Sequence, residues 1–366
     1  MKQICIVSAY GYVKTNINYG SLFQYYALEN ILKQMETAPY WLRYELPEDN
    51  KTCTQIIKSK IKKHIYFEHY KKLDLLYKKW IEFINNKLSL SQKIYNDKTI
   101  IDNIPVADIY ITGSDQVWGG EIPANYLCFV PQKYPKISYA ASFGTSKISE
   151  EKKEIISPWI QKFEKVSVRE SSGVELCKEM GIEATLVLDP TFLLNQEYYP
   201  EKEVRELKNS KFIFGYLLNL NDKEHKLIED LKIISEKYNS ELKIATVSED
   251  SYKYIPKTNR GYYTPDEWIW MYKNADGIIT NTFHGTVFSI IFHKKFVYYE
   301  QVGETKNQNE RIISLLDLLG LKERIVTQEN SIELVMGKEI NWVDVDEIVN
   351  KEKEKSKNFL TEILNY

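Results

Sequence analysis

The chain has 366 residues, of which 43% are hydrophobic and 27% are charged, and its formal net charge is −2 at pH 7. This composition is typical of a soluble globular protein, and the charge gives no overall reason to expect nucleic acid as a partner. A chain of this length exceeds what one hydrophobic core usually organises, so we expect two domains.

The four cysteines, Cys5, Cys53, Cys128 and Cys177, are widely spaced and form no CxxC pair. They indicate neither a zinc site nor a disulfide framework, so we expect buried free thiols in a reducing compartment. No apolar run reaches the ~20 residues of a membrane span. We therefore expect a cytoplasmic protein. A helix is expected around 55–85, and its lysines are suited to peripheral contact with an anionic membrane surface, at the inner face of the membrane.

Apolar runs that alternate with helical stretches predict parallel sheets with crossover helices. The first series of strands is expected at 3–9, 40–46, 107–112, 137–142, 165–169 and 185–188. The second series is expected at 211–218, 242–247, 276–280 and 296–300. Its helices are expected at 222–238, 265–275, 285–295 and 310–320. The fold class is therefore α/β, with two Rossmann-like domains.

The stretch at 195–210 is polar and charged, and it separates the two series of strands. We expect the first domain at 1–195, the second at 205–330 and a C-terminal segment at 331–366. The amphipathic helix near 343–365 is expected to cross back and pack on the first domain.

The first loop and helix, "GYVKTNINYGSLFQYY", predict a helix start capped by Asn18 or Ser21. Such a helix start offers free backbone N–H groups to an anion or a sugar hydroxyl. Gly11 and Gly20 lack the GxGxxG spacing, so the loop is not a good candidate for a dinucleotide site.

Two polar residues stand where predicted strands of the first domain end. Asp115 ends the strand in "ADIYITGSDQVW", where its carboxylate either faces the ligand crevice or accepts a hydrogen bond within an Asx-turn. Arg169 ends a short strand before a helix. It can hold a ligand carboxylate or phosphate, or it can form a salt bridge with Glu170 or with a surface carboxylate.

His284 is expected at the tip of the loop in "TNTFHGTVFSIIF", at the carboxyl end of a strand in the second domain. Ligands bind at such ends in open α/β sheets, and the small Gly285 would let a ligand approach the backbone. The alternative is that His284 caps the following helix or bonds a loop carbonyl.

The order of seven motifs, NYGS, ITGSD, SYAASFG, VSVRE, VLDPTFLL, FHGTVFSIIF and NERIISLLDLLGL, resembles the polysaccharide pyruvyl transferase family over about residues 5–321. The resemblance implies two Rossmann-like domains that face each other across a cleft, as in GT-B glycosyltransferases. It also implies transfer of the pyruvate unit of phosphoenolpyruvate onto a sugar hydroxyl pair, which forms a cyclic ketal. The partners would be phosphoenolpyruvate and a glycan or lipid-linked oligosaccharide, with no metal and no further cofactor.

The resemblance also implies roles for individual residues. His284 is the expected acid–base group, because imidazole titrates near neutral pH, and Asp115 is its expected catalytic partner near the acceptor hydroxyls. The predicted donor-binding residues are Arg169, Arg311, Lys294, Thr282 and Gly285. The predicted acceptor-binding residues are Asn18, Tyr19, Gly20, Ser114 and Trp118.

One position departs from the family pattern, because many members have an arginine where this chain has Thr282. The missing charge-assisted contact would be worth roughly 1.5–3 kcal/mol, so Lys294, Lys295 or Arg311 would have to replace it. Two other functions stay open: a glycosyltransferase that uses a nucleotide sugar, with Glu300 as its ribose contact, and a non-catalytic glycan-binding homologue.

Overall fold

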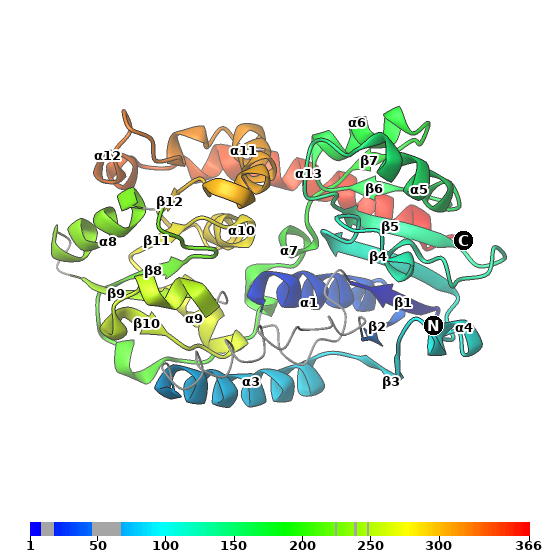
Figure 1. Ribbon diagram of the computed structural model, residues 1–366, viewed down its shortest axis with the longest axis horizontal. Helices are drawn as coiled ribbons and strands as arrows, with labels where there is room; N and C mark the ends of the chain where they lie inside the picture. Colours follow the sequence, from blue (N-terminus) through cyan, green and yellow to red (C-terminus); the bar gives the residue numbers. More distant parts are fainter. Residues whose placement is uncertain (9–17, 46–66, 224, 238–239, 247–248) are drawn as a thin grey trace.

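Two parallel β-sheets with helices packed around them form the computed structural model of the protein (Figure 1). The structure describes residues 1–8, 18–45, 67–223, 225–237, 240–246 and 249–366. Cys53 and Gly11 lie outside these ranges, as does the first part of the lysine-rich stretch at 55–85.

The first sheet has seven strands in the order β3-β2-β1-β4-β5-β6-β7, and every pair of neighbours is parallel. Its strands are β1 (Gln3–Val7), β2 (Ala38–Tyr44), β3 (Leu90–Tyr95), β4 (Ile109–Asp115), β5 (Lys136–Ala141), β6 (Ser167–Val168) and β7 (Thr185–Leu186). The helices between them are α1 (Tyr19–Gln34), α3 (Phe67–Lys87), α4 (Thr99–Asp102), η1 (Pro123–Tyr126), α5 (Glu150–Ile160) and α6 (Ser171–Glu179). In parallel sheets the carboxyl ends of the strands share one edge, and that edge carries the site described below.

The second sheet has five parallel strands in the order β10-β9-β8-β11-β12. Its strands are β8 (Phe212–Tyr216), β9 (Glu241–Ala245), β10 (Arg260–Gly261), β11 (Gly277–Thr280) and β12 (Phe296–Tyr298). Its helices are α8 (His225–Lys237), α9 (Pro265–Asn274), α10 (Phe283–Ile291), α11 (Asn309–Leu318) and α12 (Ile332–Gly337). Its shorter 3₁₀ helices are η4 (Glu249–Tyr254), η5 (Lys257–Asn259), η6 (Gly303–Gln308) and η7 (Lys322–Arg324).

The chain passes between the sheets twice. After β7 it runs through α7 (Pro190–Leu193), η2 (Gln196–Tyr198) and η3 (Arg205–Leu207) into the second sheet. The long α13 (Trp342–Ile363) then returns across the molecule to the first sheet (Figure 1). There Ser356 Oγ accepts a hydrogen bond from Leu188 N at 2.9 Å, and Lys2 Nζ donates to Leu364 O at 2.7 Å. The two ends of the chain are therefore neighbours.

Helix α1 joins the cores of the two sheets. It follows β1 in the first sheet, yet its Tyr19 ring stacks on Trp268 of α9 at 5.0 Å, and its Phe23 ring contacts Phe288 of α10 at 5.6 Å. One continuous cluster of buried apolar residues includes these side chains together with residues of both sheets. Such aromatic pairs add about 0.5–1.5 kcal/mol beyond area burial, so the two units are held firmly together.

The predicted α/β class with two Rossmann-like domains is confirmed, and each predicted strand corresponds to an observed one. Two strands were not predicted. In β3, "LSQKIY", three successive residues are exposed, as suits the edge of a sheet, so no apolar run marks it. Strand β10 has only two residues. The prediction of four buried thiols is wrong for Cys128, which is exposed, while Cys5 and Cys177 are buried.

Among the described residues, no helix is both long and apolar enough to span a membrane. Helix α3 carries exposed lysines at Lys71, Lys72, Lys78 and Lys79. Membrane contact through this helix stays a prediction.

Candidate active site

Six charged or titratable residues meet where the carboxyl ends of the first sheet face α10 and α11. This charge cluster consists of Asp115, Arg169, Glu170, Asp189, His284 and Arg311. Asp115 ends β4, Arg169 and Glu170 follow β6, and Asp189 follows β7. His284 and Arg311 come from α10 and α11 beside the second sheet. The fold thus brings together three predicted strand-end residues, Asp115, Arg169 and His284, although 169 positions of sequence separate the first from the last.

Asp115 ends β4 with a backbone φ of 72°, a conformation that non-glycine residues rarely adopt and that often marks functional sites. Its Oδ2 accepts a hydrogen bond from Ser21 Oγ at 2.8 Å, and its Oδ1 lies 3.4 Å from Arg169 Nη2. The carboxylate therefore bonds to α1 and β6 rather than only to its own turn. Burial favours a raised pKa for Asp115, but Arg169, His284 and Arg311 outweigh it and lower the pKa.

Arg169 is surrounded by carboxylates. Its Nη1 lies 2.8 Å from Asp189 Oδ2, its Nε lies 3.0 Å from Glu170 Oε1, and its side chain is only 2% exposed. The guanidinium also stacks over the Phe283 ring, with 4.2 Å between its Cζ and the ring centre. Burial alone would lower the pKa of Arg169, but the three carboxylates raise it above the ordinary arginine value. Pairing with Glu170, one of the two predicted interpretations, is therefore present along with two further ion pairs.

Asp189 lies at the start of α7 and was not predicted as a site residue. Its Oδ1 caps α7 by accepting from Thr191 N at 3.1 Å, and its Oδ2 accepts from Gln24 Nε2 at 2.6 Å. Burial would raise the pKa of Asp189, yet His284, Arg169 and Thr191 lower it far below the ordinary range. The "DPT" sequence directly after a strand could have indicated Asp189, because Asp before Pro is a common helix start.

His284 lies in the first turn of α10 and not at a loop tip as predicted. The helix begins earlier because Thr282 Oγ1 accepts from Gly285 N at 2.9 Å and caps it, so His284 is not the cap. His284 Nε2 lies 3.6 Å from Asp189 Oδ2, and the side chain is 10% exposed. On the other side of the ring, a Cβ on Gly20 would lie 2.1 Å from Nδ1. The absence of a side chain at Gly20 therefore creates the space for the histidine.

Arg311 reaches the cluster from the start of α11. Its Nη1 lies 3.9 Å from Asp115 Oδ1, and its Cζ lies 5.8 Å from the Phe283 ring centre. When the Gln116 amide presents its oxygen, it accepts from Arg311 Nη1 at 2.6 Å and from Nη2 at 3.1 Å. The side chain is 11% exposed, which makes Arg311 the more accessible of the two arginines.

A cavity of about 240 Å³ opens beside the cluster. Arg169, Asp189, Phe283 and Arg311 line it together with apolar residues of β7 and α11. His284 does not line this cavity directly but lies 3.6 Å from Asp189, which does. Asp317 and Glu352 line the cavity as well, so three carboxylates and two guanidinium groups surround it, and both guanidinium groups already have carboxylate or amide partners.

Comparison with known proteins identifies the family. The sequence model described as polysaccharide pyruvyl transferase matches residues 18–301, which is most of the chain. The chain belongs to the polysaccharide pyruvyl transferase family. Membership supports a transferase of polysaccharide biosynthesis. A search of curated proteins finds no significant match.

Several solved structures share the architecture of this family member. UDP-GlcNAc 2-epimerase from Methanocaldococcus jannaschii, solved with UDP-GlcNAc and UDP, is 14% identical over 100% of both chains, with a TM-score of 0.54. The enzyme from Rickettsia bellii is 10% identical over 100% of this chain and 97% of its own, with a TM-score of 0.56. Anabaena Alr3699/HepE, in complex with UDP and glucose, is 7% identical over 100% of both chains, with a TM-score of 0.51. At such identities the similarity shows the fold alone, which is GT-B-like as predicted.

Two residues predicted to bind the acceptor are instead part of the core. Tyr19 is 2% exposed, stacks on Trp268 and donates its hydroxyl to Tyr263 O at 2.6 Å. Trp118 is fully buried and packs against Tyr126 with ring centres 6.0 Å apart. An aromatic side chain next to a site residue can turn toward a ligand or toward the core, and here packing determines the direction.

The other predicted acceptor residues have more specific places. Asn18 caps α1 by accepting from Ser21 N at 3.2 Å, so the predicted cap is present. Gly20 faces His284 and not an open acceptor surface. Ser114 is buried next to Asp115, and its hydroxyl has no hydrogen-bond partner among the described residues.

The structure separates Lys294 from the cluster. Lys294 lies before β12, at the amino edge of the second sheet, and donates to Ala275 O at 3.1 Å. Because the cluster lies at the carboxyl edges, Lys294 cannot replace the missing arginine, and Lys295 pairs with Glu339 instead. Burial lowers the pKa of Lys294.

Gly285 has a packing role that the sequence did not predict. A Cβ on Gly285 would lie 2.0 Å from Thr280 Oγ1 and 2.6 Å from Thr282 Oγ1. This glycine therefore allows α10 to start against β11, and ligand access to its backbone stays a prediction. Thr282 is 4% exposed and serves as the helix cap, so the residue in place of the family's frequent arginine stabilises α10.

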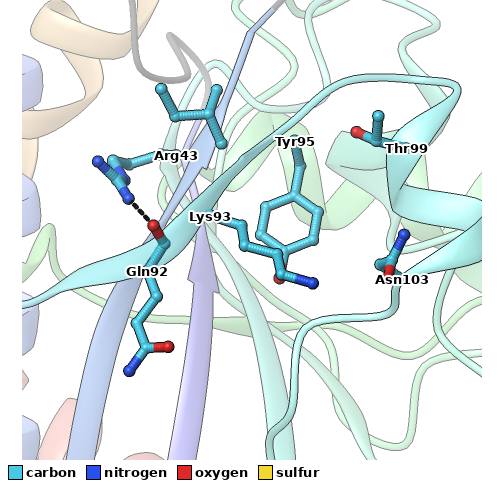
Figure 2. A pocket seen from close by; sticks show the side chains of 7 residues that line it. Arg43, Gln92, Lys93, Tyr95, Thr99 and Asn103 are labelled. Atoms are coloured by element: carbon cyan, nitrogen blue, oxygen red, sulfur yellow. Dashed lines mark hydrogen bonds between the residues drawn. The ribbon is translucent and has the colours of Figure 1, made fainter.

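A second cavity, of about 490 Å³, lies away from the cluster at the edge formed by β2 and β3 (Figure 2). It is lined by Arg43, Gln92, Lys93, Ile94, Tyr95, Thr99 and Asn103. Arg43 donates a hydrogen bond to the Gln92 backbone oxygen in this cavity. None of the predicted site residues lines it.

Proposed function

We propose that the protein transfers the pyruvate unit of phosphoenolpyruvate to a hydroxyl pair of a glycan acceptor and forms a cyclic ketal. The observation that carries the proposal is the convergence of His284, Asp115 and two arginines beside one small cavity. The range matched by the family model includes Asp115, Arg169 and His284 and ends before Arg311.

The donor fits the chemistry of the cavity. Phosphoenolpyruvate has a phosphate and a carboxylate, and arginine binds both groups with paired N–H donors. Arg311 is the better candidate for direct contact, because its side chain is 11% exposed and its nearest carboxylate, on Asp115, is 3.9 Å away. Arg169 is held by three carboxylates, so we assign it mainly to organising the site.

The reaction requires one proton at carbon and two attacks by hydroxyl groups. His284 would protonate the methylene carbon, which leaves an oxocarbenium-like centre at C2 for the first acceptor hydroxyl to attack. That hydroxyl's proton returns to His284, the bond from C2 to the phosphate oxygen breaks, and the second hydroxyl closes the ketal. Its proton leaves with the phosphate. Asp115, next to His284, would orient the acceptor hydroxyls.

The side-chain amides at the carboxyl ends of the second sheet's strands favour a small donor over a nucleotide sugar. There Asn281 bonds Leu218 N and O at 2.8 and 2.7 Å, which closes the loop after β8. Gln301 and Asn309 bond to each other through Asn309 Nδ2 and Gln301 O at 2.9 Å. Glu300, the predicted ribose contact, is exposed. These amides are already paired within the protein, which disfavours a nucleotide contact through them.

Thermal unfolding with added ligand tests the proposal. A ligand that binds only the native state raises the melting temperature by an amount that grows with the ligand concentration relative to its Kd. We expect phosphoenolpyruvate to raise it and UDP-glucose or GDP-mannose to leave it unchanged. Phosphate release in the presence of galactose-type acceptors, with detection of the ketal by mass spectrometry, then tests turnover. Stabilisation by a nucleotide sugar alone would favour the glycosyltransferase alternative.

A further inference from the structure

Asp189 is fixed in one orientation by contacts from several elements. Its Oδ1 accepts from Thr191 N at 3.1 Å and from Thr191 Oγ1 at 2.6 Å, both in α7. Its Oδ2 accepts from Gln24 Nε2 of α1 at 2.6 Å and from Arg169 Nη1 at 2.8 Å. The side chain is fully buried, so this carboxylate cannot turn away to solvent.

The His284 ring is confined between Asp189 and α1. Its Nε2 lies 3.6 Å from Asp189 Oδ2 and has no hydrogen-bond partner within the part of the chain that the structure describes. Its Nδ1 faces Gly20 so closely that a Cβ there would lie 2.1 Å away. A ring nitrogen in this place can present an N–H to the carboxylate either as the neutral Nε2–H tautomer or as the imidazolium.

The charges around the ring agree with a protonated state. The described groups of the cluster are the carboxylates Asp115 on β4, Glu170 and Asp189, and the guanidinium groups Arg169 after β6 and Arg311 on α11. Three carboxylates against two guanidinium groups leave one negative charge in a buried site. An imidazolium at His284 balances it, and buried charges need such compensation.

We infer that Asp189 is a positioning residue that holds His284 as the imidazolium acid of the pyruvyl transfer, an inference that rests on the proposed function. His284 gives its proton to the methylene carbon, and the electron pair of the carbon–carbon double bond forms the new C–H bond. The cluster is then left with one excess negative charge beside the neutral ring. This charge favours return of the acceptor hydroxyl's proton to His284, so the acid is restored within one turnover.

The test replaces Asp189 by Asn, which keeps the size of the side chain and removes the charge. We expect the high-pH limb of the activity profile to move to lower pH by about one unit or more, the scale for loss of a nearby opposite charge. The KM for phosphoenolpyruvate should change much less than kcat. As a readout besides activity, the NMR ring signal of His284, assigned with His284→Gln, should convert to the neutral form at lower pH than in the wild type.

Glu170→Gln is the matched control, because it removes one charge from the same Arg169 through a contact of 3.0 Å but leaves Asp189 in place. It should move the limb and the His284 signal less than Asp189→Asn does, because Glu170 contacts Arg169 whereas Asp189 lies 3.6 Å from the His284 ring. If Asp189→Asn does not fold, Gly20→Ala tests the same pair, since its Cβ displaces the ring without changing charge. An unmoved His284 signal in a folded Asp189→Asn protein would overturn the inference. A moved signal in a protein that never consumes phosphoenolpyruvate would support the pairing and reject the proposed function instead.

Discussion

Replacing Arg169 by Met should destabilise the protein strongly at neutral pH. The guanidinium is 2% exposed and pairs with three carboxylates that are at most 7% exposed, so its removal leaves buried negative charges without partners. Breaking one buried ion pair typically costs about 3–5 kcal/mol, which is a large part of the ~5–15 kcal/mol by which most proteins are stable. We expect a loss of at least about 3 kcal/mol in the free energy of unfolding, measured by urea denaturation at pH 7.

The loss should shrink as the pH falls. In the wild type the folded pKa values of Asp115 and Asp189 are lowered, so their stabilisation is present above the ordinary carboxyl pKa of about 4 and is lost as the pH falls through the lowered values. Without Arg169, burial raises the pKa values of Asp115 and Asp189. The variant therefore loses the most stability at a pH at which these buried carboxyls must ionise. The difference between the two proteins should therefore be largest near pH 7 and smaller near pH 4.

Arg311→Met is the matched control, since it removes the same group from a more exposed place with the nearest carboxylate oxygen 3.9 Å away. It should lose less stability than Arg169→Met, because the nearest carboxylate oxygen lies 3.9 Å from Arg311 but 2.8 Å from Arg169. Equal losses in the two variants, or a loss in Arg169→Met that does not depend on pH, would refute the assignment of Arg169 as the centre of the buried pairs.

Four further outcomes follow from the site. His284→Gln should fold normally and lose turnover by ~100-fold or more with little change in donor affinity, as measured by phosphate release and calorimetry. Arg311→Met should weaken phosphoenolpyruvate binding about tenfold or more by calorimetry. Lys294→Met should leave that affinity unchanged, because Lys294 lies at the opposite edge of the second sheet; a tenfold loss would contradict this placement. Thr282→Val should cost about 1 kcal/mol of stability through loss of the α10 cap and spare donor binding.

The sequence predicted that the site residues lie together, because the direction of a strand tells at which end of the sheet its last residue lies. Once two parallel sheets are inferred, Asp115, Arg169 and His284 each follow a strand, and the carboxyl ends of parallel strands share an edge. The same rule would have excluded Lys294, which precedes its strand. Which edge a residue occupies is therefore predictable, even when its partners are not.

Side-chain direction was harder to predict. Tyr19 and Trp118 stand next to motif residues, but both pack in the core, because rings of this size gain more from burial against Trp268 and Tyr126 than from a polar crevice. The roles of glycines were also missed. Gly20 is required by the approach of His284, which lies 264 positions later in the chain, and no local pattern shows such a contact.

The position of α1 between the two sheets has a consequence for how such proteins can be recombined. Tyr19 and Phe23 belong to the first sheet's connection by sequence, yet they pack on Trp268 and Phe288 of the second. A chimera that joins the first half of one family member to the second half of another would place unmatched rings at this junction. Productive exchange therefore requires α1 to be transferred together with α9 and α10.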